Sequence, residues 1–448
     1  MHPEAQEQNQ IIKENNSTTY NLLSEKGKNI FFPKKGILSQ VAEAKGKKYN
    51  ATAGIAVNDD GSPFRLKAIE KGVNLSPDQV FPYVTSYGNL ELRQKWKELL
   101  KKKNYSLKSD FSLPVVTQAL TQGLSMVGYL FVDPGDKIIL TDKFWGNYRL
   151  IFENGYNAVL DGFNTFDRSK FDLDSFRKKL NEKTKNNEDI NNIENKKTTE
   201  IENKKIILLN FPNNPTGYTL TDEEVEEITK IIKESAEQGK EILVILDDAY
   251  FGLVYESGVF KESLFSKLAD LHENVLAVKV DGTTKEDYVW GLRVGFLTFA
   301  GKGITPEIYR VLEDKTAGAI RGNISNVSNL SQSLVLAAYG SSDYEAEKLE
   351  KFNQLQERYE KVKEVLRDPK FKETFTHLPF NSGYFMCVEL KEGLNTEKVR
   401  QVLLEKYDTG VVVFGNLIRV TFASLAEEDI PQVFENIYLA CQEVRLGP

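Results

Sequence analysis

Short apolar runs alternate with amphipathic stretches between about Pro114 and Phe296. The runs are VVTQAL, KIIL, NAVL, KIILLN, EILVILDD and NVLAVKV, and stretches such as TDEEVEEITKIIKESAEQGK have the periodicity of a helix that packs on a core. Near-continuous apolar runs are typical of parallel strands covered by helices on both faces. The pattern predicts an α/β fold with a large, doubly wound, mainly parallel sheet, which would bind its ligand at the carboxyl ends of the strands.

A second pattern begins after about Pro306. A long helical stretch, YEAEKLEKFNQLQERYEKVKEVLRD, is followed by the short strand patterns FNSGYFMCVEL and VVVFGNLIRVTF. This order predicts a smaller α+β domain, and we expect the N-terminal residues to pack with it as a discontinuous lobe. The predicted boundaries are 77–310 for the large domain, with 1–76 and 311–448 for the small one.

Residues 181–205 interrupt the large-domain pattern. This segment is rich in Asn, Glu and Lys and has almost no apolar side chains. A segment that buries so little apolar surface does not offset its ordering entropy. We therefore predict a disordered surface insertion between a helix and a strand.

Composition excludes several classes of protein. The chain has 58 basic and 65 acidic residues and a net charge of −7, which argues against a nucleic-acid partner. Two cysteines in 448 residues do not form a disulfide framework and favour a reducing compartment. Three histidines leave little material for a metal site or a histidine-based triad, so we expect no bound metal.

The N-terminal stretch MHPEAQEQNQIIKENNSTTY is polar and acidic, which is unlike a secretory signal or a transit peptide. No apolar run approaches the length of a membrane span. We therefore expect a cytoplasmic protein with no membrane partner.

Three segments whose side chains could bind a ligand or take part in a reaction follow three of the predicted strands. Phe211–Thr221 (FPNNPTGYTLT) lies between a strand and a helix, and Asp247–Tyr250 (DDAY) ends the next strand. Asp281–Lys285 (DGTTK) ends another, and Arg293 follows in GLRVG. Taken singly, these are a turn, a helix cap and surface charges. The same positions are also where doubly wound sheets place their ligands.

The order and spacing of these segments change that interpretation. Asn-Pro-Thr-Gly, then Asp-x-x-Tyr, then Thr-x-Lys with an arginine eight residues later, resembles the fold-type I pyridoxal-phosphate enzymes. Within them the chain is most similar to the class I/II aminotransferases, and to aspartate aminotransferase in particular. The resemblance runs from about Asn50 to the C-terminus, apart from the insertion. It implies pyridoxal 5'-phosphate as the cofactor.

The resemblance assigns a role to each residue of these segments. Lys285 would form the Schiff base with the cofactor and, once released, move the Cα proton of the substrate. Asp247 would pair with the pyridinium nitrogen and keep the ring cationic. Asn214 and Tyr250 would hydrogen-bond the phenolic oxygen, and Arg293 would bind the phosphate.

Other residues match the same site by resemblance. Ala119, Leu120 and Thr121 stand where the family has its phosphate loop, although Leu120 replaces the usual glycine. Trp145, in FWGNY, would stack on the pyridine ring. Tyr83 would reach the phosphate of a neighbouring subunit, which implies a homodimer with shared active sites.

The chain departs from the family pattern at one position before the lysine. The family commonly has a serine where this chain has Gly282. We expect Thr284 to supply the hydroxyl instead.

The resemblance also implies a substrate class. Arg419, in NLIRVTF, would bind the substrate α-carboxylate through two parallel hydrogen bonds. Arg321, in AIRGNISN, would cross the dimer to a side-chain carboxylate, and Gly54 would lie in the loop lining the pocket. Trp145 and Asn214 are expected to contact the substrate as well as the cofactor.

These features favour transamination between L-aspartate or L-glutamate and a 2-oxo acid, by a ping-pong route through pyridoxamine phosphate. Two alternatives within the enzymes stay open: an aromatic aminotransferase and a carbon–sulfur lyase, because a fold does not determine its reaction. An alternative of another class is a non-catalytic regulatory protein that binds the cofactor. The acidic charge and the short, polar N-terminal segment disfavour it.

Overall fold

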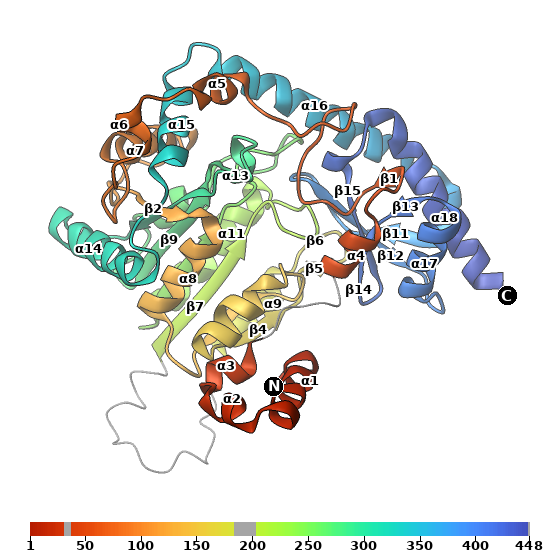
Figure 1. The fold of residues 1–448 in the computed structure, drawn as a ribbon, viewed down its shortest axis with the longest axis horizontal. Helices are drawn as coiled ribbons and strands as arrows, with labels where there is room; N and C mark the ends of the chain where they lie inside the picture. Colours follow the sequence, from red (N-terminus) through yellow and green to blue (C-terminus); the bar gives the residue numbers. More distant parts are fainter. Residues whose placement is uncertain (31–36, 183–202, 447–448) are drawn as a thin grey trace.

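The computed structural model describes residues 1–30, 37–182 and 203–446, and a seven-stranded sheet lies at its centre (Figure 1). The strand order is β2-β10-β9-β8-β7-β3-β4, and β10 alone runs antiparallel to the other six strands. The strands are β2 Val115–Gln118, β3 Lys137–Thr141, β4 Val159–Phe163, β7 Lys204–Asn210, β8 Glu241–Asp247, β9 Val275–Gly282 and β10 Val294–Ala300. Every apolar run named above forms a strand of this sheet. The predicted α/β fold is confirmed.

Helices surround this sheet, as the alternating pattern predicted (Figure 1). Helix α11 shows how the sequence starts one: the Thr221 hydroxyl accepts from the Glu224 N–H, and the Glu224 carboxylate accepts from the Thr221 N–H. No helix in the described ranges is both long and apolar enough to cross a membrane. The helices are α5 Lys67–Glu70, α6 Pro77–Val80, α7 Leu90–Lys103, α8 Ala119–Phe131, α9 Leu173–Asn181, α11 Asp222–Glu237, α12 Phe265–Leu268, α13 Thr283–Glu286, α14 Pro306–Asn323 and α15 Asn329–Tyr339.

A second, smaller sheet lies beside the first. Its four antiparallel strands have the order β11-β12-β15-β14, and a short parallel pair, β1 with β13, extends this part of the molecule. The α+β character predicted for the C-terminal region is thus present. The elements are α4 Ile37–Glu43, β1 Tyr49–Asn50, α16 Tyr344–Val365, β11 Phe375–His377, β12 Phe385–Leu390, α17 Thr396–Lys406, β13 Thr409–Gly410, β14 Val412–Phe414, β15 Leu417–Thr421 and α18 Ile430–Leu446.

The buried apolar side chains form two clusters that do not divide the chain at the predicted boundaries. The larger cluster takes in residues 56–69 and 309–355 as well as the central sheet. The smaller cluster contains Ala51 and most of the buried apolar side chains between 359 and 441, whereas Tyr384, Phe385 and Ala423 belong to the larger one. We propose a smaller lobe drawn mainly from residues 37–51 and 359–441, because the apolar faces of α5, α14 and α15 pack on the larger core.

The N-terminal helices also lie elsewhere than expected. Helices α1 Pro3–Asn15, α2 Ser17–Leu22 and α3 Glu25–Asn29 pack beside the central sheet, where the Asn154 amide donates to the Asn29 carbonyl at 2.9 Å. The expected insertion at 181–205 is narrower, because Asn181 ends α9 and β7 begins at Lys204. Its expected disorder concerns residues 183–202, which lie outside the described part of the chain.

Candidate active site

The carboxyl ends of three adjacent strands bring the main candidate residues together. Strand β7 ends at Asn210 and pairs in register with Asp247 at the end of β8, while β9 leads directly into the short helix α13, which carries Lys285. The Asn210 amide donates to the Asp247 carbonyl at 2.7 Å, and its oxygen accepts from the Asn214 N–H at 2.8 Å. Asn210, at the end of β7, therefore fixes the backbone positions of both Asp247 and Asn214.

Asp247 is a buried carboxylate that a tyrosine holds in place. Its Oδ2 accepts from the Tyr148 hydroxyl at 2.6 Å, and its Oδ1 accepts from the Ala249 N–H at 3.2 Å. Burial raises the pKa of Asp247, against the lowering effects of the Tyr148 hydrogen bond and of the nearby Lys285 charge. Trp145 packs edge-on against Tyr148, with 5.6 Å between ring centres. This carboxylate is therefore held rigidly in a site where a cationic partner would stabilise it.

The Lys285 amine lies above the Tyr250 ring, with Nζ 4.9 Å from the ring centre. Within the described part of the chain, this Nζ makes no hydrogen bond or ion pair. Burial lowers the pKa of Lys285 to about 8; the charge of Asp247 opposes this shift, and that of Arg293 adds to it. A half-buried amine that titrates near neutrality is the form a nucleophile or a general base needs.

This pKa predicts how cofactor capture depends on pH. Only the neutral amine attacks an aldehyde, and the Lys285 amine becomes neutral as the pH rises through about 8. The rate at which cofactor-free protein captures pyridoxal phosphate should therefore rise between pH 7 and about 9 and then level off. Stopped-flow absorbance across this range measures it. A rate still climbing in proportion to hydroxide at pH 10 would show an unperturbed lysine instead.

Arg419 is a buried guanidinium without a carboxylate partner in the described residues. Its Nη1 donates to the Asn214 oxygen at 3.3 Å, its Nη2 donates to the Thr52 carbonyl at 3.2 Å, and its Nε has no partner. Its guanidinium lies over the Phe385 ring at 4.4 Å. Burial lowers the pKa of Arg419, with Tyr250 as the main opposing influence. An arginine with spare donors near Tyr250, the residue whose ring lies against the Lys285 amine, is suited to bind a carboxylate.

The start of α8 offers free N–H groups beside the same strand ends. Unlike α11, this helix has no side-chain cap, and its first residue, Ala119, has a φ of +59°. The first turn of a helix leaves its N–H groups without intrahelical partners. Thr284 contributes a buried hydroxyl that has no partner, and Arg293 is half-buried with a φ of +55°. These groups together could bind a phosphate dianion.

Close packing explains why residue 282 is a glycine where the family commonly has a serine. A Cβ on this residue would lie 2.7 Å from both the Gly295 Cα and the Val294 carbonyl oxygen. A Cβ on Gly295 would in turn lie within 3.0 Å of the backbone of Ala119 and Leu120. The close approach of β9, β10 and the first turn of α8 therefore excludes a side chain here.

Three candidate residues are exposed at the surface. Tyr83 is 93% exposed, and Arg321, in the last turn of α14, is exposed as well. Gly54 is exposed two residues after Thr52, the residue whose carbonyl binds Arg419. Within one chain, the structure therefore places Gly54 near the buried Arg419 and leaves Tyr83 and Arg321 exposed on the outside.

Three residues of the site were missed in the sequence. Tyr148 holds Asp247, Asn210 orders two segments, and the Tyr384 hydroxyl donates to the Lys285 carbonyl at 3.3 Å. The sequence contains a signal for Asn210, because it is the polar last residue of an apolar strand run. The signal for Tyr148 is weaker, namely its position three residues after Trp145, and the sequence contains no signal for Tyr384.

Comparison with known proteins identifies the family. The model for aminotransferase class I and II matches residues 55–437 of this chain. The chain belongs to this family. It is 28% identical to an aspartate aminotransferase of Sulfurisphaera tokodaii over 320 residues, which cover 70% of each chain. It is also 28% identical to a probable N-acetyl-LL-diaminopimelate aminotransferase of Bacillus subtilis, over 62% of this chain and 60% of that one.

Solved structures agree on the fold. An aminotransferase from Anaerococcus prevotii superposes with a TM-score of 0.80 at 21% identity, covering 94% of this chain and all of that one. A kynurenine aminotransferase of Pyrococcus horikoshii, solved with pyridoxamine phosphate, superposes with a TM-score of 0.74 at 17% identity, covering 95% and 98% of the two chains. Membership of the family implies pyridoxal phosphate as the cofactor and amino acids with 2-oxo acids as the substrates.

Proposed function

We propose that this aminotransferase moves the amino group of an amino acid, with aspartate or glutamate favoured, to a 2-oxo acid by a ping-pong mechanism. The observation that carries the proposal is the half-buried Lys285 amine, which makes no ion pair with any residue that the structure describes and lies beside the Asp247 carboxylate at the ends of the parallel strands. An amine in this setting can bind a cofactor aldehyde and later exchange a proton with the substrate. We place the activity in the cytoplasm and in a homodimer.

The residues around this amine fit pyridoxal phosphate. Asp247 would hold the ring nitrogen, with Trp145 against the ring, and Asn214 and Tyr250 would hold the phenolic oxygen. The phosphate would lie on the first turn of α8 (Ala119, Leu120 and Thr121) with Thr284 and Arg293, and the partner's Tyr83 would complete it. The orphaned Thr284 hydroxyl and the uncapped start of α8 are the features that support this fit. The bound cofactor supplies an electron sink for the substrate Cα.

The protein's own groups would then orient the substrate and move one proton. Arg419 binds the α-carboxylate with two donors, and its contact with Asn214 holds the guanidinium on the cofactor side. The Lys285 amine takes the proton from Cα and returns it in the reverse half-reaction. The pKa of about 8 leaves part of the amine neutral at physiological pH, so that it can accept the proton.

The preference for substrates with a side-chain carboxylate depends on a partner subunit, which would contribute Arg321. The end of α14 with Arg321 lies near the start of α8, where the Gln122 amide donates to the Asn323 oxygen at 2.9 Å. The loop with Tyr83 is close by, since Asn329 donates to the Pro82 carbonyl at 3.3 Å. The Tyr83 and Arg321 side chains are therefore exposed in one region.

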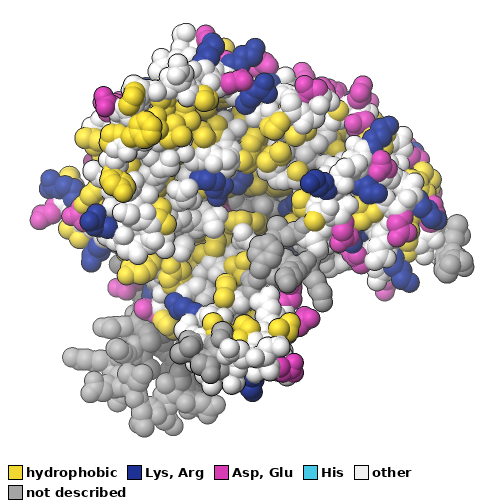
Figure 2. Space-filling view, in the orientation of Figure 1, with side chains coloured by type: hydrophobic (Ala, Val, Ile, Leu, Met, Phe, Trp, Pro, Cys, Tyr) yellow, Lys and Arg dark blue, Asp and Glu magenta, His cyan; other side chains and the backbone are white. Residues whose placement is uncertain are grey.

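Exposed apolar side chains support an interface on the same side of the molecule. Hydrophobic side chains gather over α5, α6 and α15 (Figure 2), and Val73, Phe81, Tyr83 and Leu330 are among the exposed ones. Contiguous exposed apolar surface often marks a protein–protein contact. We propose that a second copy covers this face and contributes Arg321 and Tyr83.

The visible absorption spectrum of the purified protein tests the function. We expect a cofactor band that shifts to the amino form when L-aspartate is added and returns with 2-oxoglutarate. In Arg321→Ala, the shift should need at least about tenfold more aspartate, while an aromatic amino acid should react as before, because only the dicarboxylate loses a charge-assisted contact. A wild-type band that ignores aspartate but responds to phenylalanine would favour an aromatic aminotransferase. Release of pyruvate and ammonia would mark a carbon–sulfur lyase, and no band at all would overturn the proposal.

A further inference from the structure

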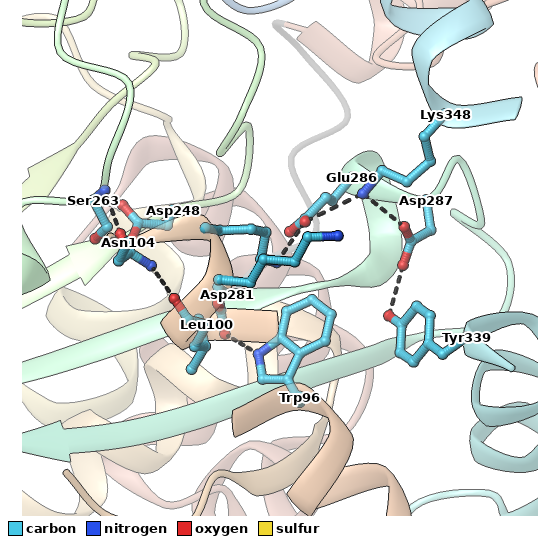
Figure 3. Close-up of polar contacts among 12 residues, drawn as sticks. Trp96, Leu100, Asn104, Asp248, Ser263, Asp281, Glu286, Asp287, Tyr339 and Lys348 are labelled. Atoms are coloured by element: carbon cyan, nitrogen blue, oxygen red, sulfur yellow. Dashed lines mark hydrogen bonds and ion pairs between the residues drawn. The ribbon is translucent and has the colours of Figure 1, made fainter. Parts of the chain in front are cut away.

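The two residues after Lys285 are acidic and buried, and they contact other elements than Lys285 does. The Lys285 amine faces Tyr250, whereas Glu286 and Asp287 enter a network of charged and hydroxyl groups from α7, α15 and α16 (Figure 3). Their side chains are 7% and 0% exposed. The proposed function uses neither of them.

One lysine contacts both carboxylates. Lys348 Nζ lies 3.3 Å from Glu286 Oε1 and 3.2 Å from Asp287 Oδ1. Glu286 Oε1 also accepts from Lys103 at 2.5 Å. Asp287 accepts from the Tyr339 hydroxyl at 2.7 Å through Oδ2 (Figure 3). It also accepts from the Tyr344 hydroxyl at 2.6 Å through Oδ1. The turn of chain that carries Lys285 is therefore held from three helices.

The charges of this network are compensated. Burial acts to raise the pKa of Glu286, but Lys103 and Lys348 outweigh it and bring this pKa to about 2. Burial likewise acts to lower the pKa of Lys348, and Asp287 and Glu286 reverse that direction. Glu286 and Lys348 are thus both ionised at neutral pH. Buried ion pairs add little net stability compared with apolar packing, so their value lies more in geometry.

Lys348 also connects the turn to the rest of the molecule. It lies in the first turns of α16 beside Tyr344, and residues near the end of the same helix, Tyr359 and Val362, belong to the smaller apolar core. The helix is continuous from Tyr344 to Val365. The position of α13 is therefore tied to a rigid element that spans both cores (Figure 1).

We propose that Lys348 is a positioning residue for Lys285: by binding Glu286 and Asp287 together, it fixes helix α13 and so the line along which the Lys285 amine reaches the substrate Cα. This inference rests on the proposed function of Lys285. It predicts an effect on the proton-transfer step, because misplacing a catalytic group by about 1 Å can cost about 100-fold in rate.

The test compares Lys348→Met with Lys351→Met in the full-length holoenzyme. Methionine keeps most of the side-chain length and removes the charge. Lys351 lies one turn further along α16 and contacts Asn58 and Gln354 instead of the α13 turn, so it is the matched control. Borohydride reduction and peptide mapping first establish that each protein carries the cofactor on Lys285.

We expect Lys348→Met to lower kcat by about 10- to 100-fold per cofactor-loaded site, with KM changed by less than about threefold. The kinetic isotope effect with Cα-deuterated amino acid should increase, because proton transfer by Lys285 becomes the slow step. Lys348→Arg, which keeps the charge, should recover part of kcat, and Lys351→Met should match the wild type. A purely structural role would lower the melting temperature and leave kcat per loaded site and the isotope effect unchanged.

An unchanged kcat and isotope effect in loaded Lys348→Met would overturn the proposal. If that variant does not fold, Tyr344→Phe and Tyr339→Phe each remove one hydroxyl from Asp287. The double variant should lower kcat by at least about threefold and raise the isotope effect. No change in either quantity would equally overturn the proposal that these contacts position Lys285. A wild-type protein that carries no cofactor on Lys285 would instead overturn the proposed function, and with it the positioning role of Lys348.

Discussion

Lys285→Ala should reduce turnover by at least about 1,000-fold and leave the protein folded. The substitution removes both the covalent attachment of the cofactor and the base that moves the Cα proton, and a positioned base alone contributes about 10²- to 10⁴-fold. The amine makes no ion pair with a described residue, and the burial that lowers its pKa outweighs its attraction to Asp247, so removing its charge relieves a net cost to the folded state. The melting temperature of the cofactor-free protein should therefore stay the same or rise.

The control is Lys267→Ala, which removes an ion pair with Glu226 at the surface and should keep full activity. The measurements are single-turnover absorbance with L-aspartate and mass spectrometry of peptides after borohydride reduction. Full turnover in Lys285→Ala, or reduction of the cofactor onto a different lysine, would contradict the assignment of Lys285 as the cofactor lysine.

The strands and the segments at their ends could be predicted because their signal is local. A buried parallel strand has an almost continuous apolar run, as EILVILDD does before Asp247, and its end marks the ligand edge of the sheet. Strand β10 has the same kind of run, but its antiparallel direction depends on the short return from α13. Direction is a property of the connection, so the run alone did not show it.

The division of the chain between the two cores could not be predicted in the same way. Helices α14 and α15 have apolar faces that would suit either core, and only the tertiary arrangement assigns them to the larger one. Helices α1 to α3 are mostly polar, so their position beside Asn154 had no periodic signal.

The supporting contacts of the site depend on distances between remote segments. Tyr148 reaches Asp247 across 99 residues of sequence, and Tyr384 reaches the Lys285 carbonyl across another 99. Gly282 appeared as a missing serine, and only the approach of Gly295 shows why a side chain is excluded. Motif spacing finds the groups that would touch the cofactor, whereas packing determines the groups that hold them in place.

Arg419→Met should separate activity from stability. Losing two charge-assisted hydrogen bonds to the substrate carboxylate costs roughly 3 kcal/mol or more, so kcat/KM should fall by about 100-fold or more. Without substrate, this guanidinium is buried with two long hydrogen bonds, a bare Nε and no carboxylate partner among the described residues. Its removal relieves a desolvation cost, so the melting temperature should not fall.

Arg400→Met is the matched control, because Arg400 is equally buried but paired with Glu397 and Glu43. It should lower the melting temperature and leave kcat/KM unchanged, the reverse of the Arg419 result. Calorimetry of the cofactor-free proteins and steady-state kinetics with L-aspartate measure both quantities. If Arg419→Met instead lost stability and kept its kcat/KM, the guanidinium would be a structural group and the carboxylate would bind elsewhere. A buried charge kept unpaired at a cost to the free protein is what a carboxylate-binding site requires, because the substrate then completes the pair.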